Sequence, residues 1–413
     1  MKYVVLGASA AGINGARELR KQDPNGEIVL ISKDEAIYSR CILHHYLSGH
    51  RNLSQISFAE ADFAQRYQIH WIKGQAAVSL NPQDKVVTLE NGDAVSYDKL
   101  LIATGSHSFV PPIKNVREAV NKTGFRNLED MEILKTAAAE RKNIVVMGAG
   151  LVGLDCTSGL LELGVSVTLI DLAGWMLSRQ LDPKAAARYQ EAFAKKGVQQ
   201  LYGIGISEAI LNEKQEITEL ILSDGSHLPC DFLVLTAGVR ANVEFLEGSG
   251  IETSRFGLVY DETGKTSDPD VYGAGDVSGT SPIWPVAVKE GIIAADNMTG
   301  KKRRMSDFFA SKSTMNFLGI AAMSLGDVNA EEGCQVEICE TKDSYKKIIH
   351  KDGQITAALL VEDLAYGGVL QQLIARKIDI TKVKKPVFDI DYSDFFHIKE
   401  NFEFTYEEDR KGE

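Results

Sequence analysis

The chain has 413 residues, of which 44% are hydrophobic and 25% charged, and its formal net charge is −12. This composition is typical of a folded globular protein with two to four domains. An acidic chain argues against nucleic acid or an anionic membrane as the main partner, and no apolar run reaches the roughly 18 residues of a membrane helix. Five cysteines without a paired framework favour a reducing compartment, and because the chain opens on a strand we expect no signal peptide and a cytoplasmic protein.

The first motif is a glycine-rich turn in Lys2–Gly12, KYVVLGASAAG. An apolar strand leads into Gly7, Ser9 and Gly12, which take the three positions of the G-x-G-x-x-G spacing. Ser9 is small enough for a close backbone approach, but it makes the fingerprint weaker than one with three glycines. The pattern predicts a first dinucleotide-binding βαβ unit.

The acidic residue that should bind the ribose in this first unit is missing from its usual position. A helix from Gly12 to about Lys21 leads to a strand over Glu27–Ile31, and Ser32 stands where the acid is expected. Either Asp34 or Glu35 must therefore take this role.

The segment Ile37–Gly49, IYSRCILHHYLSG, is the least generic stretch of the chain. It holds one cysteine, Cys41, followed three and four residues later by His44 and His45. On one helix face the two histidines would stabilise a Cys41 thiolate, although solvated histidines without a catalytic role are the alternative. No second cysteine lies near enough to form a vicinal C-x-x-x-x-C pair.

A second and complete copy of the nucleotide-binding device lies in Asn143–Asp171. After an apolar strand, Gly148, Gly150 and Gly153 fill the fingerprint at the point where a helix must start. The next strand ends in Asp171, whose carboxylate would accept hydrogen bonds from a ribose 2′-hydroxyl and repel a 2′-phosphate. This unit is therefore predicted to bind NAD(H) rather than NADP(H).

Three further segments end apolar strands in glycine turns: Tyr97–Gly105 with Thr104 and Gly105, Asp231–Gly238 with Gly238, and Thr266–Asp276 with Gly275 and Asp276. Together with the doubled fingerprint, they resemble the FAD-dependent pyridine nucleotide oxidoreductases, flavoproteins that bind two dinucleotides. The resemblance covers about residues 1–300. It implies that FAD lies on the first fingerprint, that Asp276 binds the flavin ribitol, and that NAD lies on the second fingerprint.

The order of the motifs, with this resemblance, gives the expected architecture. The fold class is α/β, with two Rossmann-like domains and a small α+β C-terminal domain. We expect a split FAD-binding domain over 1–112 and 238–304, an inserted NAD-binding domain over 113–237, and the C-terminal domain over 305–413. The last contains strands within Thr314–Asp327 and Tyr345–Glu362, an Asp352-Gly353 hairpin and a helix near Gly368–Arg376.

Two branches of the family resemble this chain. The frame Tyr38-x-Arg40-x-x-Leu43 and the small C-terminal domain resemble the NADH:rubredoxin oxidoreductases and NADH-dependent nitrite reductase flavoproteins, in which the arginine binds the FAD ribose or pyrophosphate. Cys41 is placed as in the NADH peroxidases, NADH oxidases and coenzyme A disulfide reductases. However, the histidine that the peroxidases carry in the first fingerprint is replaced here by Ala10.

The leading hypothesis is an NADH-linked FAD oxidoreductase that exchanges electrons with a small redox protein, a rubredoxin or a ferredoxin-like iron–sulfur protein. One alternative is a thiol-linked reductase of a coenzyme A disulfide, persulfide or peroxide, with Cys41 and His45 as catalytic residues. The other is a flavoprotein subunit of a larger redox complex, and a homodimer also stays open. No metal-ligand cluster is predicted.

The run Lys301-Lys302-Arg303-Arg304 is the densest cluster of positive charge in the sequence. It is interpreted as a solvated linker, and the alternative is a docking patch for an acidic electron carrier.

Overall fold

The computed structural model describes residues 1–141, 143–280, 283–306, 312–398 and 400–406. The chain divides into two compact units. The first contains Met1–Gly148, Asp155–Val165 and Ile206–Ala310, and the second contains Ala149–Leu154, Ser166–Gly205 and Ser311–Glu413. The division passes through the expected NAD-binding domain, so the domain boundaries given above stay a prediction.

The first unit contains a five-stranded parallel sheet in the order β18-β7-β1-β2-β3. Its strands are short apolar runs: β1 Lys2–Leu6, β2 Glu27–Ser32, β3 Ile69–Lys73, β7 Lys99–Ile102 and β18 Val271–Gly273. Alternate residues of β1 and β2 enter two different hydrophobic clusters, so both faces of the sheet are buried. The predicted strands at Lys2, Glu27, Tyr97 and Thr266 are confirmed in position.

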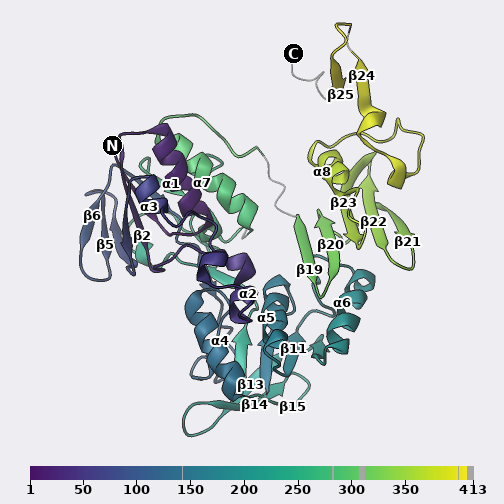
Figure 1. Ribbon diagram of the computed structural model, residues 1–413, viewed down its shortest axis with the longest axis horizontal. Coiled ribbons are helices and arrows are strands. Elements are labelled where there is room, and N and C mark those ends of the chain that lie inside the picture. The colour runs from purple at the N-terminus through teal and green to yellow at the C-terminus, as the bar shows by residue number, and fades with distance from the viewer. Residues whose placement is uncertain (142, 281–282, 307–311, 399, 407–413) are drawn as a thin grey trace. The chain divides into compact units, whose positions relative to one another are not determined.

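Helices cover one face of this sheet and a small antiparallel sheet covers the other (Figure 1). The helices are α1 Ala10–Gln22, α3 Phe63–Arg66 and α7 Trp284–Met298. The small sheet consists of β4 Ala77–Asn81, β5 Val86–Leu89 and β6 Ala94–Ser96. This arrangement leaves the carboxyl ends of the parallel strands open, where α/β proteins bind ligands.

The first unit also contains a parallel group in which β16 pairs with both β9 and β10. These strands and their neighbours are β9 Lys122–Thr123, β10 Ile144–Met147, β16 Phe232–Leu235 and the helix α4 Leu128–Glu140. An antiparallel meander, β13 Ile206–Leu211, β14 Ile217–Leu222 and β15 His227–Pro229, adjoins them in the chain. Two short crossing strands, β8 Ser106–Ser108 and β17 Val239–Ala241, pair antiparallel.

The second glycine fingerprint leads into α5 Leu151–Glu162, as predicted, and the strand after it is β11 Val167–Asp171. In the second unit β11 pairs in parallel with β12 Gln199–Tyr202, and α6 Pro183–Lys195 connects them.

The C-terminal part of the second unit is an antiparallel sheet in the order β19-β20-β23-β22-β21, followed by one helix. Its elements are β19 Ser313–Phe317, β20 Ile320–Leu325, β21 Gln335–Glu340, β22 Tyr345–Lys351, β23 Gln354–Val361 and α8 Gly367–Ala375. The predicted hairpin is confirmed: Asp352 and Gly353 both have positive φ, 50° and 76°, between β22 and β23. A last hairpin joins β24 Phe396–Ile398 and β25 Phe404–Tyr406.

The segment around Cys41 differs from the single helix that we expected. Cys41 lies in a 3₁₀ turn, η1 Arg40–Ile42, and the two histidines lie in the following helix α2 Leu43–Leu47. The other 3₁₀ turns are η2 Leu53–Gln55, η3 Glu244–Leu246, η4 Asp276–Ser278, η5 Val387–Asp389 and η6 Tyr392–Phe395. Within the described residues, every helix is too short or too polar to cross a membrane.

Candidate functional site

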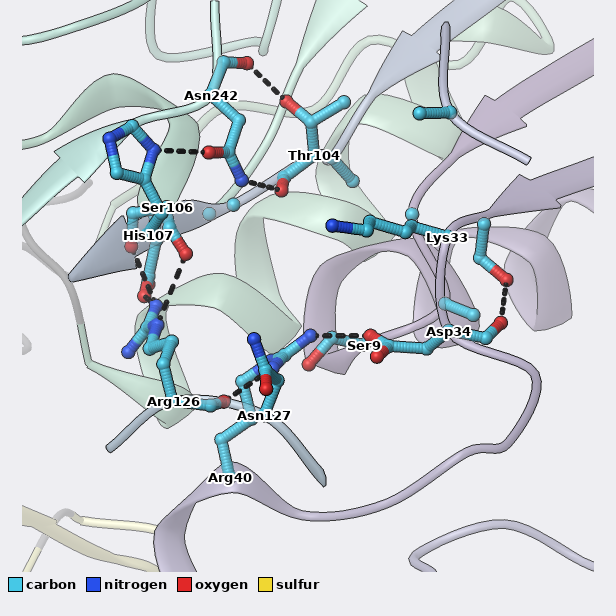
Figure 2. A pocket seen from close by; sticks show the side chains of 18 of the residues that line it. Ser9, Lys33, Asp34, Arg40, Thr104, Ser106, His107, Arg126, Asn127 and Asn242 are labelled. Atoms are coloured by element: carbon cyan, nitrogen blue, oxygen red, sulfur yellow. Dashed lines mark hydrogen bonds and ion pairs between the residues drawn. The ribbon is translucent and has the colours of Figure 1, made fainter. Parts of the chain in front are cut away.

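A cavity of about 840 Å³ opens in the first unit at the carboxyl ends of β1, β2 and β7 (Figure 2). Its wall brings together residues from distant parts of the sequence, as the topology of a parallel α/β sheet requires. The predicted site residues on this wall are Gly7, Ser9, Asp34, Arg40, Cys41, Thr104, Gly105, Gly275 and Asp276.

The first glycine turn forms one end of the cavity. Gly7 has φ 109°, and a side chain there would place Cβ 2.1 Å from the carbonyl oxygen of Ala103, so only glycine fits. Gly12 packs in the same way on Gly7, where Cβ would lie 1.8 Å from the carbonyl oxygen. Ser9 is the N-cap of α1 and its side chain caps none of the helix N–H groups. The positive end of α1 therefore faces the cavity and is suited to an anionic pyrophosphate.

Asp34 and Arg40 form a hydrogen-bonded cluster on the wall (Figure 2). Arg40 Nη2 donates to Asp34 Oδ2 at 2.7 Å, and the hydroxyl of Tyr38 donates to Asp34 Oδ1 at 2.8 Å. Burial raises the pKa of Tyr38 above its usual range, so the phenol keeps its proton. Of the two acids considered for the ribose, Asp34 lines the cavity, whereas Glu35 lies beside Gly74.

The carboxylate of Asp276 is paired with a cation that the sequence did not reveal. Arg126 Nη2 donates to Asp276 Oδ2, and the same nitrogen donates to the hydroxyl of Ser106 at 2.7 Å. The carbonyl of Arg126 in turn accepts from Arg40 Nη1 at 2.5 Å. Arg126 thus joins the two predicted ligands Arg40 and Asp276 into one network.

Thr104 and Asn242 hold the opposite side of the cavity (Figure 2). Thr104 Oγ1 donates to the carbonyl of Asn242 at 2.8 Å, and Asn242 Nδ2 donates back to the carbonyl of Thr104 at 2.8 Å. His107 Nδ1 lies 2.7 Å from Asn242 Oδ1. Gly105, Gly238 and Gly275 all have positive φ, as expected for tight strand-end turns.

Cys41 lies on the cavity wall with an exposed side chain. Partial removal from water raises the pKa of its thiol, the carboxylates of Asp155 and Asp276 raise it further, and the charge of Arg126 opposes them. Neither His44 nor His45 is among the main causes of this shift, and the surroundings of each histidine lower its own pKa. The surroundings of Cys41 therefore favour the thiol over the thiolate.

The second glycine turn carries Gly148 with φ 114°, in contact with the backbone of Thr236. Gly150 would meet nothing within 4 Å if it carried Cβ, so its backbone is open to an approaching ligand. The carboxylate of Asp171 accepts from two backbone N–H groups, Ala149 at 2.5 Å and Ala173 at 2.7 Å. Asp171 therefore stabilises the second glycine turn through these hydrogen bonds.

The sequence profile of the family described as pyridine nucleotide-disulphide oxidoreductase matches residues 1–291 of the 413. The chain belongs to this family. A second profile, the C-terminal domain of rubredoxin NAD⁺ reductase, matches residues 312–378.

Several known proteins are similar to this oxidoreductase over most of its length. A subunit, epsilon, of an NADH-dependent phenylglyoxylate dehydrogenase from Aromatoleum evansii is 30% identical over 93% of each chain. An NADH-rubredoxin oxidoreductase from Clostridium acetobutylicum is 26% identical over 90% of this chain and 94% of its own. The chain also matches a nitrite reductase [NAD(P)H] from Bacillus subtilis and the large subunit of a nitrite reductase (NADH) from Escherichia coli, and it spans about half of their length, 48% and 46%.

Among solved structures, an NAD-dependent persulfide reductase from A. fulgidus superposes with a TM-score of 0.83 over 93% of this chain and 78% of that chain. At 23% identity this likeness concerns the fold. The predicted fold class, with two dinucleotide-binding units and a C-terminal domain, is confirmed.

This oxidoreductase is accordingly an NAD(H)-linked flavoprotein enzyme, as predicted, and its cofactors are FAD and NAD(H). The cavity fits FAD, because the turn at Gly7 and the open N-terminus of α1 provide a cradle for a pyrophosphate. Arg40 and Arg126 supply further charge-assisted donors on the same wall.

Sequence reasoning missed Arg126, Asn242 and Lys33, all of which line the cavity. Arg126 precedes Asn127, which caps α4 in a box with Asp130, and such an N-x-x-D pattern predicts a helix start but not a ligand. Among the described residues, no group of three histidine, cysteine or acidic side chains is arranged to hold a metal ion.

Proposed function

We propose that this flavoprotein passes electrons from NADH to a small iron–sulfur carrier, a rubredoxin or a ferredoxin-like protein. The observation that carries the proposal is the match of residues 312–378 to the C-terminal domain of rubredoxin NAD⁺ reductase. The Clostridium acetobutylicum relative, whose name states NADH and rubredoxin, supports it over nearly its whole length.

The bound flavin supplies the chemistry that links a two-electron donor to one-electron acceptors. The chain supplies binding and charge. We assign FAD to residues of the cavity and its strand-end turns, namely Gly7, Ser9, Gly12, Asp34, Arg40, Thr104, Gly105, Gly238, Gly275 and Asp276. We assign NAD(H) to the second fingerprint, with Gly148, Gly150, Gly153 and Asp171.

In this proposal Cys41 remains a thiol and takes no electrons. The raised pKa of Cys41 supports that role, because thiol chemistry beside a flavin needs the thiolate. His45 then has no thiolate to stabilise.

The test is anaerobic reduction of rubredoxin and of a [2Fe–2S] ferredoxin by NADH, with the purified FAD-loaded protein as catalyst. We expect rapid bleaching of the flavin by NADH and reduction of at least one of the two carriers, in the wild type and in Cys41→Ser alike. Flavin bleaching without reduction of either carrier would contradict the proposal, and ferricyanide serves as the control acceptor.

A thiol-linked reductase is the second candidate, and the exposure of Cys41 on the cavity wall favours it. It would act on a coenzyme A disulfide, a persulfide or a peroxide. Loss of such activity in Cys41→Ser, with NADH-driven bleaching retained, would support this candidate.

A subunit of a larger redox complex is the third candidate, because the Aromatoleum evansii relative is by name a subunit of a dehydrogenase. This candidate predicts that the chain purifies with other subunits. Full NADH-to-carrier activity of the isolated chain would oppose it.

A further inference from the structure

A group of ionisable side chains leads away from the cavity wall at Cys41. One turn further along the chain, His44 of α2 faces Asp155 of α5: Nδ1 of His44 lies 3.2 Å from Oδ1 of Asp155. Both side chains are largely buried, with 20% and 23% of their surface exposed. Nδ1 of His44 is fully buried and has no well-directed hydrogen bond within the described part of the chain, so a small rotation would close one to Asp155.

The close approach of α5 to α2 depends on Gly159. A Cβ at this position would lie 3.2 Å from the carbonyl oxygen of His44 and 3.0 Å from a methyl group of Leu47. Gly159 lies one helical turn after Asp155, so both face α2. The glycine therefore brings the carboxyl group within reach of the imidazole.

Further histidines connect this pair to the surface. The ring of His45 lies 4.1 Å from that of His44, and the ring of His50 lies 6.3 Å from that of His45. His50 is 55% exposed, and its Nε2 lies 3.6 Å from Oε2 of Glu162. Three imidazoles thus run from a buried carboxyl group to solvent.

The surroundings set the charge of the buried pair. Desolvation raises the pKa of Asp155 to about 7. Desolvation also lowers the pKa of His44 to about 4, and the neighbouring His45, Arg51 and His50 act in the same direction.

The other charged groups around the pair lie at its two ends. Cys41, Arg126 and Asp276 lie toward the cavity, and the charge of Asp155 reaches the Cys41 thiol. On α4, Glu132 accepts from Tyr46 at 2.8 Å, and Asp130 acts on the neighbouring Cys156. On α5, Glu162 faces His50. Near neutral pH Asp155 therefore gains and loses its charge beside a His44 side chain that is neutral.

We propose that Asp155 and His44 form a proton-transfer pair that carries the proton released by NADH oxidation toward solvent through His45 and His50. The reaction with one-electron acceptors is NADH + 2 acceptor(oxidised) → NAD⁺ + 2 acceptor(reduced) + H⁺, so each turnover releases one proton. The Asp155 carboxylate takes that proton and passes it to Nδ1 of His44, and the other ring nitrogen of His44 releases a proton toward His45. This inference rests on the proposed function only in that electrons leave one at a time.

The experiment uses the FAD-loaded protein, NADH and ferricyanide, with the variants Asp155→Asn and His44→Gln. His70→Gln, an exposed histidine on β3, and Asp62→Asn, an exposed aspartate, are the matched controls. Stopped-flow with a pH indicator measures proton release, and kcat is measured against pH. Infrared difference spectra follow the protonated carboxyl group of Asp155 without any turnover.

We expect an inflection of kcat near pH 7 in the wild type and its loss in Asp155→Asn. In that variant kcat and the rate of proton release should fall together by about tenfold or more, as for other positioned acid–base groups. The KM for NADH should change less than about twofold, since the role assigned is not substrate binding. His44→Gln should slow proton release to a similar extent, and both controls should match the wild type.

An unchanged inflection in Asp155→Asn, or a raised KM with unchanged kcat, would overturn the inference in favour of a binding role. An infrared carboxyl band that titrates near pH 4 in the wild type would overturn the inference as well. If Asp155→Asn does not fold, the proton release of His44→Gln and the pH at which this band titrates test the inference instead. The proposed carrier and the proton-transfer pair can fail separately. If the protein does not reduce rubredoxin, but the variants still lose proton release with ferricyanide as acceptor, rubredoxin is rejected as the carrier and the proton-transfer pair is supported.

Discussion

Arg126 and Asp276 form an ion pair on the wall of the cavity although 150 residues separate them in the sequence. Both side chains are more than four-fifths buried. The pair links the segment that leads into α4 to the strand-end turn after β18, so it fixes the wall on which we place the flavin ribitol.

Replacement of Arg126 by Gln should weaken FAD binding. It removes a charge-assisted donor and leaves the Asp276 carboxylate without its cation, a loss of about 1.5–3 kcal/mol or roughly 10- to 150-fold in affinity. Titration of the apoprotein with FAD, followed by quenching of flavin fluorescence, measures this. Arg141→Gln, which breaks a comparable pair with Glu216, is the control. Equal FAD affinity of Arg126→Gln and wild type would show that the pair is not part of the site.

Asp171 should set the preference for NADH. Asp171→Asn removes the charge that repels a 2′-phosphate, so the ratio of kcat/KM for NADH over NADPH should fall by about tenfold, or ~1.4 kcal/mol. Steady-state kinetics with both cofactors measure the ratio. Equal use of NADH and NADPH by the wild type would mean that Asp171 is misassigned.

The same residue should also stabilise the fold. Asp171→Ala removes the acceptor for the N–H groups of Ala149 and Ala173, and hydrogen bonds to a charged group contribute about 1.5–3 kcal/mol each. We therefore expect a lower Tm for the Ala variant than for the Asn variant, measured by differential scanning fluorimetry. An identical Tm would indicate that these contacts contribute little.

The secondary structure and the glycine turns were predictable because they depend on local patterns. The apolar runs at Lys2 and Ile144 and the glycine at position 7 dictate a strand and a turn wherever the rest of the chain lies. The partners of Arg126 and His44 were not predictable. Each meets a residue far away in sequence, and only the packing of α4 and α5 brings them together.

One local expectation also differed from the structure. The continuous helix from Cys41 to His45 is replaced by a 3₁₀ turn and a short helix, so the three side chains do not share one helix face.

The stability of the protein should depend on pH through Asp155. Its pKa is about 7 in the folded protein and about 3.9 in an unfolded chain, so the folded state binds the proton more tightly. The stability that this proton provides is complete below about pH 4 and is lost as pH rises through 7.

Asp155→Asn should therefore be more stable than the wild type at pH 8, by roughly 2–4 kcal/mol, and nearly equal to it at pH 4. Urea unfolding across this range measures the difference, with Asp62→Asn as the control. A difference that is the same at both pH values would show that Asp155 titrates normally.

The basic run Lys301–Arg304 should stabilise the fold through ion pairs with nearby carboxylates rather than form a docking patch for a carrier. Arg303 Nη1 lies 2.9 Å from Oδ2 of Asp296, a carboxylate that is only 4% exposed, and Arg304 Nη1 lies 3.1 Å from Glu262. We expect Arg303→Gln to destabilise the protein by about 1–3 kcal/mol, because it leaves a buried charge poorly compensated. Lys302→Gln is the control in urea unfolding. Neutralising all four residues should leave the salt dependence of carrier reduction unchanged, and a flatter dependence would restore the docking patch.

The most direct test of the proposed function is an anaerobic titration of the FAD-loaded protein with NADH, in the wild type and in Cys41→Ser. If Cys41 is not a redox centre, both proteins take up two electrons per flavin and bleach fully with one equivalent of NADH. Uptake of four electrons per flavin by the wild type and only two by Cys41→Ser would contradict the account and assign the protein to the thiol-linked reductases.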